Sequence, residues 1–376
     1  MILPMPVAFR RRALLPALLV LGLSGCAHWR AAEADEAQDR PLAAAVGLPA
    51  AVVPEAFSTP DQPGAEIDSV SAWLAPDGAR WLIATGKDSH DLRVFDGDDG
   101  RLLRIVGGEG DAPGRFRRPN GVFVWGDRLF VVERDNRRVQ VLDLPSFRPL
   151  ATFGEGALES PYGLWLEEPA AGELTVWVTD SPMDGEDHDR LPPLERLDGR
   201  LQRFDLALDG DSVSARAAGR FGPTDEANAL HLVESVAGDR AHGVLLVAEE
   251  DAARGTGYHV HDLEGRDTGR RLGVGEFRAQ AEGIAAWTCP DGSGYWVAAD
   301  QFTDRTVFRV FDRATLATLG AFVGRRTAGT DGLWIRQAPS PRFPAGVLYA
   351  ADDDLRVSAF DWRDVARALG LRETCR

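Results

Sequence analysis

Apolar and polar positions repeat along the chain in six segments, each roughly 45 residues long. Each segment combines a turn residue, usually Gly, with an apolar strand, a polar turn, a second apolar strand such as 129–132, and a third strand ending near Phe-Asp. The segments open at Ser69, Asn120, Tyr162, Glu234, Glu282 and Asp331. Such repeats are typical of a propeller, because each four-stranded blade buries its faces only against neighbouring blades. We therefore predict an all-β, six-bladed β-propeller forming a single domain over residues 58–376.

Two stretches depart from the repeat. The third segment is over-long, and its extra residues, 181–199, are dense in Asp, Glu and Pro, which favours a surface loop. Helical periodicity is nearly absent until residues 362–371, which predict a short C-terminal helix.

The N-terminus has the pattern of a bacterial lipoprotein signal. Three arginines at 10–12 precede an apolar run at 13–23, which is too short to span a bilayer, and small residues then lead to Cys26. We predict a signal peptide over 1–25, a lipid on the Cys26 thiol, and a flexible tether over 26–57. The protein would then be exported and held by its lipid in the cell envelope, at the outer membrane. An uncut N-terminal membrane anchor is the alternative.

The formal charge is −16, and removal of the three signal arginines makes it −19. This charge excludes nucleic acid as an expected partner. An excess of carboxylates suits a protein that collects cations, although simple solubility explains many surface acids equally well. We expect the protein to act as a monomer.

Residues that open the repeats should converge, because the innermost strands of a propeller start around a common axis. A second set follows where the next strand ends, and it comprises Lys87, Arg134, Asp180, Glu249, Glu250, Asp300 and Asp352. If both sets share one end, repeats one to three offer cations and a phenol, and repeats four to six offer carboxylates. Two carboxylates about 4 Å apart repel by about 4 kcal/mol at an effective dielectric near 20, so a cation such as Ca²⁺ is expected. Alternatively, the Glu-Gly and Asp-Gly pairs are only turn formers.

Lysine, cysteine and histidine usage adds three observations. Lys87 is the only lysine among 42 basic residues, and a compact ammonium suits phosphate binding, although its survival by chance is an open alternative. The sequence leaves open whether Cys289 and Cys375 form a disulfide. His259 and His261 favour one face of a strand over a zinc site.

Several stretches together resemble the β-propeller phytases, calcium-dependent phosphatases that remove phosphate from myo-inositol hexakisphosphate. The likeness runs from about Asp68 to Leu371. Its best-matched stretches are 68–73, 84–87, 162–164, 246–251, 281–284, 294–299, 329–332 and 360–366.

The resemblance implies a phosphoric monoester hydrolase with Ca²⁺ as cofactor and a phosphorylated small molecule as substrate. It implies that phosphate is held by Lys87, Arg134 and Tyr162. It implies that calcium or calcium-bound water is held by Asp68, Glu234, Glu249, Glu250, Glu282 and Asp331, and we expect Asp331 also to act as an acid near the leaving oxygen. Ser69, Asp88 and Gln280 replace charged residues of the family, so we expect reduced activity.

Two other interpretations compete with this one. The second repeat, at residues 114–124 and 135–143, resembles an NHL repeat, which favours a lipid-anchored binding propeller without catalysis. A lactonase-type propeller with one calcium ion would use fewer carboxylates and no phosphate-binding Lys and Arg.

Overall fold

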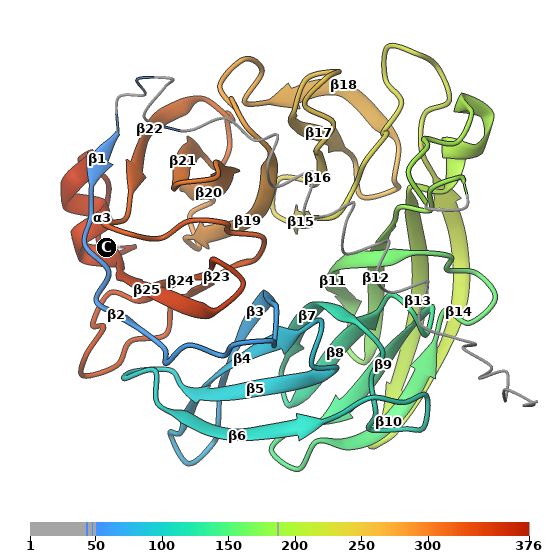
Figure 1. Cartoon of the computed structure of the whole chain (residues 1–376), viewed down its shortest axis with the longest axis horizontal. Coiled ribbons are helices and arrows are strands. Elements are labelled where there is room, and N and C mark those ends of the chain that lie inside the picture. The colour runs from blue at the N-terminus through green and yellow to red at the C-terminus, as the bar shows by residue number, and fades with distance from the viewer. Residues whose placement is uncertain (1–42, 44–46, 48–49, 186–187, 376) are drawn as a thin grey trace, which may run out of the picture.

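Six four-stranded antiparallel sheets stand around a central axis as the blades of a propeller (Figure 1). The computed structural model describes residues 43, 47, 50–185 and 188–375. The predicted all-β, six-bladed fold is confirmed. The predicted signal peptide, the lipid site at Cys26 and the expected tether up to residue 42 lie outside the described residues.

Each of the first three blades follows the chain from the axis outward. Blade 1 consists of β3 (Ile67–Leu74), β4 (Arg80–Gly86), β5 (Asp91–Asp96) and β6 (Leu102–Gly107). Blade 2 consists of β7 (Pro119–Trp125), β8 (Arg128–Glu133), β9 (Arg138–Asp143) and β10 (Arg148–Phe153). Blade 3 consists of β11 (Pro161–Ala170), β12 (Glu173–Asp180), β13 (Leu201–Asp209) and β14 (Ser212–Phe221), with the 3₁₀ helix η1 (Leu194–Gly199) before β13.

The other three blades complete the ring. Blade 4 consists of β15 (Val236–Asp239), β16 (Val244–Glu249), β17 (Gly257–His261) and β18 (Asp267–Leu272). Blade 5 consists of β19 (Ala281–Thr288), β20 (Gly294–Gln301), β21 (Thr306–Asp312) and β22 (Thr318–Val323), with β1 (Ala51–Val52) at its edge. Blade 6 consists of β23 (Leu333–Arg336), β24 (Val347–Asp352), β25 (Arg356–Asp361) and β2 (Phe57–Ser58).

The N-terminal strands close the ring. β2 pairs antiparallel with β25, with Phe57 opposite Ala359, and β1 pairs parallel with β22, with Ala51 opposite Phe322. The tether expected over 26–57 is therefore wrong from residue 50 onward, because these residues occupy sheet edges that would otherwise expose unpaired backbone groups. Among the described residues, no helix is long and apolar enough to cross a bilayer.

The core lies between the blades. The clusters that join neighbouring blades contain residues from both, as where Phe153 of blade 2 packs against Phe204 of blade 3. The second strand of each blade is almost completely buried, as the pattern of β16 shows. Both of its faces lie against other blades, which explains the continuous apolar runs in the sequence.

The predicted C-terminal helix is confirmed as α3 (Trp362–Leu369). Asp361 caps its first turn by accepting a hydrogen bond from Arg363 N, and Gly370 ends it in the left-handed conformation with a φ of 67°. Beside it, Cys289 and Cys375 form a disulfide with Cα atoms 5.4 Å apart, which settles the pairing that the sequence left open.

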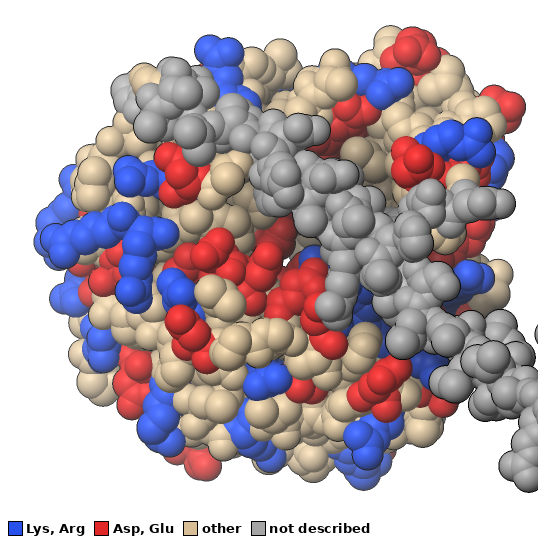
Figure 2. All heavy atoms as spheres, in the orientation of Figure 1, with Lys and Arg blue, Asp and Glu red and all other residues tan. Residues whose placement is uncertain are grey.

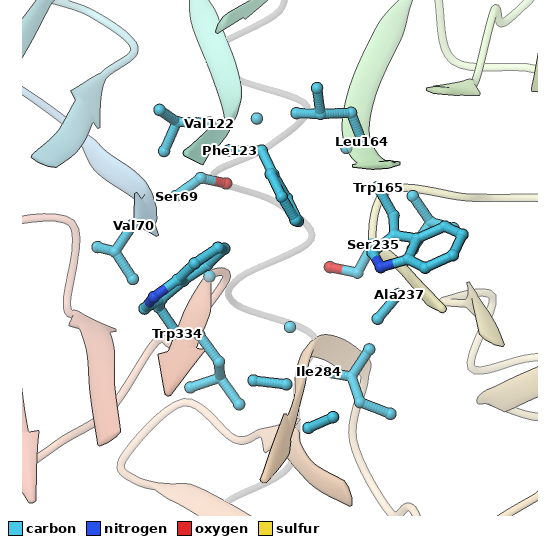
Figure 3. A pocket seen from close by; sticks show the side chains of 18 of the residues that line it. Ser69, Val70, Val122, Phe123, Leu164, Trp165, Ser235, Ala237, Ile284 and Trp334 are labelled. Atoms are coloured by element: carbon cyan, nitrogen blue, oxygen red, sulfur yellow. The ribbon is translucent and has the colours of Figure 1, made fainter. Parts of the chain in front are cut away.

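A cavity of about 220 Å³ follows the axis between the inner strands. Its middle is lined by the rings of Phe123, Trp165 and Trp334, which lie three residues along from the repeat-opening positions (Figure 3). Phe123 and Trp334 meet edge to face with centroids 5.1 Å apart.

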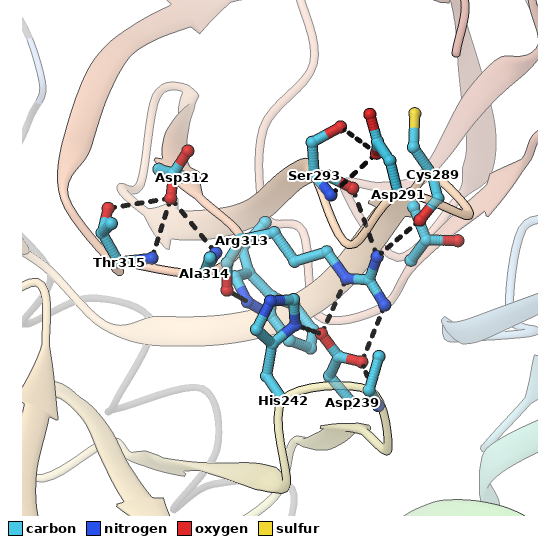
Figure 4. A network of polar contacts seen from close by, with 12 residues as sticks. Asp239, His242, Cys289, Asp291, Ser293, Asp312, Arg313, Ala314 and Thr315 are labelled. Atoms are coloured by element: carbon cyan, nitrogen blue, oxygen red, sulfur yellow. Dashed lines mark hydrogen bonds and ion pairs between the residues drawn. The ribbon is translucent and has the colours of Figure 1, made fainter.

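A buried ion pair joins blades 4 and 5 at the far end of β15 (Figure 4). Arg313 Nε and Nη2 donate to the two carboxylate oxygens of Asp239, each at 2.7 Å. Asp239 also accepts from His242 Nδ1 at 2.7 Å, and Arg313 Nη1 donates to the Cys289 and Ser293 carbonyls at 3.2 Å. We call this group of five residues the clasp.

Candidate functional site

One residue from each blade lines a small cavity at the start of the inner strands. The strand registers place these residues at equivalent positions. Each lies two residues before the first regularly paired residue of its inner strand, for example before Val122, which pairs with Val131, and before Ile284, which pairs with Ala298. We call them the mouth ring: Asp68, Asn120, Tyr162, Glu234, Glu282 and Asp331. The convergence predicted from the repeats is present. In blade 1, however, the ring residue is Asp68, one position before the predicted Ser69.

The residue after each ring member lies where neighbouring blades nearly touch. A Cβ atom on Gly121 would collide with the carbonyl oxygen of Tyr162, and one on Gly163 with that of Glu234. Gly283 and Gly332 face the backbone of the next blade in the same way, and their φ values are not in the left-handed range. The alternative that these glycines are only turn formers is therefore wrong, because close approach of the blades requires them.

Three carboxylates gather on the blade 4 and blade 5 side of the mouth. Glu234, Glu250 and Glu282 each offer an oxygen atom, and these atoms all lie within 4.8 Å of one another. Glu250 also accepts a hydrogen bond of 3.1 Å from Glu234 N. Their field reaches Tyr258, whose pKa is raised well above its usual value by burial and by Glu282 and Glu250. Figure 2 shows Asp and Glu side chains around the central opening on the face drawn.

Cations lie on the blade 1 side. Lys87 Nζ lies 3.0 Å from Asp68 Oδ2 and 3.1 Å from Glu66 Oε1, and Arg118 Nη2 lies 3.0 Å from the same Glu66 oxygen. Burial raises the pKa of Glu66, but Lys87 and Arg118 outweigh it and lower that pKa to about 2. Lys87 therefore contacts two carboxylates at once, those of Glu66 and Asp68.

Arg134 and Asn120 lie on the blade 2 side. Arg134 Nε contacts Asp135 Oδ1 at 2.8 Å, and although burial lowers its pKa, the nearby Tyr162 and Asp135 raise it. Asn120 is only 2% exposed, and neither its amide nitrogen nor its amide oxygen has a hydrogen-bond partner among the described residues. A buried amide without a partner costs free energy, so the cavity is suited to a polar ligand or an ion.

The residues predicted at the ends of the second strands have two different functions. Lys87, Arg134, Glu250 and Gln301 share one register position, and Gln301 Nε2 donates to Asp331 Oδ1 at 2.9 Å. Acids one residue earlier in register instead accept hydrogen bonds from backbone N–H groups of the loops that lead into the inner strands. We call these acids the loop anchors: Glu133, Asp180, Glu249, Asp300 and Asp352.

The loop anchors correct the expected positions of four acids. Glu249 was expected to hold calcium, but it accepts from His231 N at 2.7 Å and from Leu232 N at 3.2 Å and does not join the group of three. Asp180, Asp300 and Asp352 also point away from the mouth. Successive strand residues point to opposite faces, so an acid one position earlier in register than the mouth residues faces the other way. Burial raises the pKa of Asp180 to about 6 despite its backbone hydrogen bonds.

His259 and His261 lie in β17, as expected for residues of one strand face. His259 Nδ1 and His261 Nε2 are buried without a hydrogen-bond partner among the described residues. Burial, with the nearby Arg271, lowers the pKa of His259 to about 3. No group of metal-ligating side chains within the described part of the chain includes either histidine.

Sequence reasoning missed Glu66, Arg118 and Gln301 as members of the site. Gln301 was detectable as the residue equivalent to Lys87, Arg134 and Glu250 once the repeats are aligned. No repeat signal marks Glu66, which adopts a φ of 55° before β3.

Comparisons with known proteins found similarity only among solved structures. The sequence matches no protein-family model and no curated protein. Among solved structures, hydrazine synthase of Kuenenia stuttgartiensis is similar, with 12% identity and a TM-score of 0.48 over 80% of this chain and 96% of that chain. The β-propeller domain of Myceliophteria thermophila Cps50 (Swd1) shares 12% identity and a TM-score of 0.47 over 82% and 99%.

A structure of the nidogen/laminin complex is similar over 70% of this chain and 82% of that chain, with 14% identity and a TM-score of 0.46. The function must be argued from the mouth ring and its neighbours.

Proposed function

We propose that this propeller is a calcium-dependent phosphatase, similar to the β-propeller phytases, that hydrolyses a phosphorylated small molecule at the channel mouth. The observation that carries the proposal is the side-by-side arrangement of a three-carboxylate group and a set of cations around one cavity. The group comprises Glu234, Glu250 and Glu282. The cations include Lys87, which contacts the ring residue Asp68, and Arg134, which interacts with the ring residue Tyr162.

The donor set and its dimensions fit calcium. Protein oxygen atoms bind Ca²⁺ at about 2.3–2.6 Å, so two oxygens on one ion lie at most about 5 Å apart. The three carboxylates meet this limit at 4.8 Å. The cavity of about 20 Å³ has room for one water-sized species, so an organic substrate would lie above the ring.

The excess of negative charge at the mouth indicates that a cation must bind there before an anionic substrate can. The mouth ring and its immediate neighbours contain seven carboxylates, of Glu66, Asp68, Asp88, Glu234, Glu250, Glu282 and Asp331. Within the described part of the chain, the cations that contact this group include Lys87, Arg118 and Arg134. A phosphate monoester would be repelled from such a site unless bound cations offset the excess. Phosphate release should therefore require calcium.

Calcium would supply positive charge beside the phosphate and lower the pKa of a bound water. The chain's own residues would hold the substrate: Lys87 and Arg134 donate to phosphate oxygens, and the Tyr162 phenol donates a further hydrogen bond. Asp331, held by Gln301, would hold a proton near the leaving oxygen. Asn120 would direct its amide at a ligand or water in the cavity.

The test is phosphate release from myo-inositol hexakisphosphate and from a smaller phosphomonoester, with calcium and with chelator. We expect release in calcium only, with loss in Lys87→Ala, partial retention in Lys87→Arg, and no change in the surface control Arg148→Ala. Absence of calcium-dependent release from both substrates would contradict the phosphatase proposal.

One observation favours the binding propeller as a second candidate. Lys87 already contacts Glu66 and Asp68, so a phosphate group would have to compete with both carboxylates. Calcium binding measured by calorimetry without phosphate release would support this second function. Lipid attachment at Cys26 is a separate proposal, tested by membrane fractionation of Cys26→Ser.

A further inference from the structure

We propose that Glu55, on the N-terminal segment between β1 and β2, is a positioning residue that fixes the loop carrying Asp331 into the mouth ring. Its consequence for calcium rests on the function proposed above. The sequence placed this residue in a flexible tether. The structure instead places its carboxylate against the loop at residues 324–327, which precedes β23.

The carboxylate of Glu55 accepts four hydrogen bonds from this loop. Oε1 accepts from Arg326 N at 3.0 Å, from Thr327 N at 3.1 Å and from Thr327 Oγ1 at 2.8 Å, and Oε2 accepts from Arg325 N at 3.2 Å. A Cβ atom on Gly324 would collide with Oε1, so the glycine allows the carboxylate to approach. Burial raises the pKa of Glu55, but these hydrogen bonds lower it overall, so the group is ionised at neutral pH. Hydrogen bonds to an ionised acceptor are among the stronger ones in proteins.

The other blades show what this arrangement does. In blade 4 the loop anchor Glu249 accepts from His231 N and Leu232 N, and the ring residue Glu234 follows two residues later. In blade 5 Asp300 holds the amides of Arg278 and Ala279, three residues before Glu282. In both blades an acid thus gathers amides of the entering loop that lie two or three residues before the ring residue.

Blade 6 lacks a complete anchor of its own. Asp352, at the equivalent position, accepts one amide of the entering loop, Ala328 N, at 3.3 Å. Glu55 collects the three amides immediately before it. The N-terminal segment therefore supplies the part of the anchor that the blade does not.

The held loop leads directly to Asp331. Thr327 O accepts from Thr306 N at 2.9 Å, and Thr330 Oγ1 donates to Ala351 O at 2.8 Å. Gly332 N then donates to Asp68 O at 3.1 Å, which joins blade 6 to blade 1 beside the ring. Loosening residues 325–327 would release the chain four residues before the ring carboxylate.

The test uses Glu55→Ala with added formate. The substitution leaves a carboxylate-sized space lined by four donors, which formate can fill and chloride at the same ionic strength cannot. Glu168→Ala is the matched control, because Glu168 also accepts a loop amide, Gly172 N, but on a hairpin that does not lead into the ring. Hydrogen exchange of residues 325–333 and calcium affinity by calorimetry are measured for each protein.

We expect faster exchange at 325–333 in Glu55→Ala, unchanged exchange in β2, and restoration of slow exchange by formate. Calcium affinity should fall roughly tenfold and recover with formate, as expected for a residue that orients a ligand. Unchanged exchange at 325–333 would overturn the positioning role, whether or not the wild type binds calcium. Normal calcium affinity in a loosened variant would overturn the link to Asp331, and absence of calcium binding by the wild type would instead overturn the proposed function.

Discussion

The carboxylates at the two ends of β15 have opposite electrostatic surroundings. At its far end, the clasp surrounds Asp239 with Arg313 and His242, and although burial raises the pKa of Asp239, these partners lower it overall. At its near end, Glu234 meets two further glutamates within 4.8 Å. The clasp is balanced and joins two blades, whereas the mouth concentrates charge of one sign. In the clasp the charge of Asp239 is already offset by Arg313. The three glutamates at the mouth repel one another, so a bound cation would stabilise them.

The largest effect on stability is expected when the cation of the clasp, Arg313, is removed. Arg313→Met should lower the free energy of unfolding by about 3–5 kcal/mol, because Asp239 would stay buried with only His242 beside it. Urea unfolding measures this loss. The double variant Arg313→Met with Asp239→Leu should recover most of it, since the buried charge is then absent. A loss below about 1 kcal/mol in the single variant would show that the clasp is not the balanced pair inferred here.

The mouth should respond to calcium in a way that the clasp does not. At a calcium concentration 100 times the dissociation constant, the free energy of unfolding should rise by about 2.7 kcal/mol. Glu250→Gln should remove this gain yet raise the stability of the calcium-free protein by about 1 kcal/mol, because one repelling charge is gone. Thermal unfolding with calcium and with chelator measures both effects. The exposed control Glu264→Gln should show neither, and equal calcium responses in both variants would contradict the site.

Acid should weaken blade 4 through His259 of β17. The pKa of His259 is about 3 in the folded protein and about 6.5 when unfolded, so the unfolded chain binds more protons between these values. Stability therefore falls as pH drops from about 6.5 to 3, by up to about 1.4 kcal/mol per pH unit. His259→Gln should make the measured slope shallower than in the wild type. At pH 8, where His259 and His261 are neutral, any difference in stability between the two proteins reflects packing alone. Identical slopes of stability against pH would refute the prediction.

An exposed ion pair provides the smallest effect and a reference for the clasp. Arg148, at the start of β10, and Asp211, in the turn between β13 and β14, join blades 2 and 3 at 2.6 Å, but their side chains are 51% and 68% exposed. Arg148→Ala should change the free energy of unfolding by at most about 0.5 kcal/mol. A loss as large as that of Arg313→Met would mean that burial does not separate the two pairs.

The repeat pattern predicted the ring and its six blades, and helical periodicity predicted α3, because strand period, helical period and apolar runs are local properties of the sequence. The same repeats located five of the six ring residues, and the resemblance added Asp68. The register of blade 1 was misjudged by one position, since Asp68 and Ser69 both precede Val70 and only the pairing of Val70 with Ala84 decides between them.

The loop anchors show why the rest could not be predicted. Glu249 and Glu250 are adjacent and chemically identical, yet one holds backbone amides and the other faces the mouth, because adjacent strand residues point in opposite directions. Glu55 carries no periodic signal, and its partners lie about 270 positions away in the chain.

The sequence by itself determined the propeller, the acidic excess and five of the six residues that open the blades, since these follow from periodicity and composition. Only the tertiary structure decided which acids face one another, which are used by loops, and how the N-terminal strands close the ring. The physical reason is that charge balance and hydrogen-bond satisfaction depend on distances of a few ångströms between blades, and those distances exist only once the ring is closed.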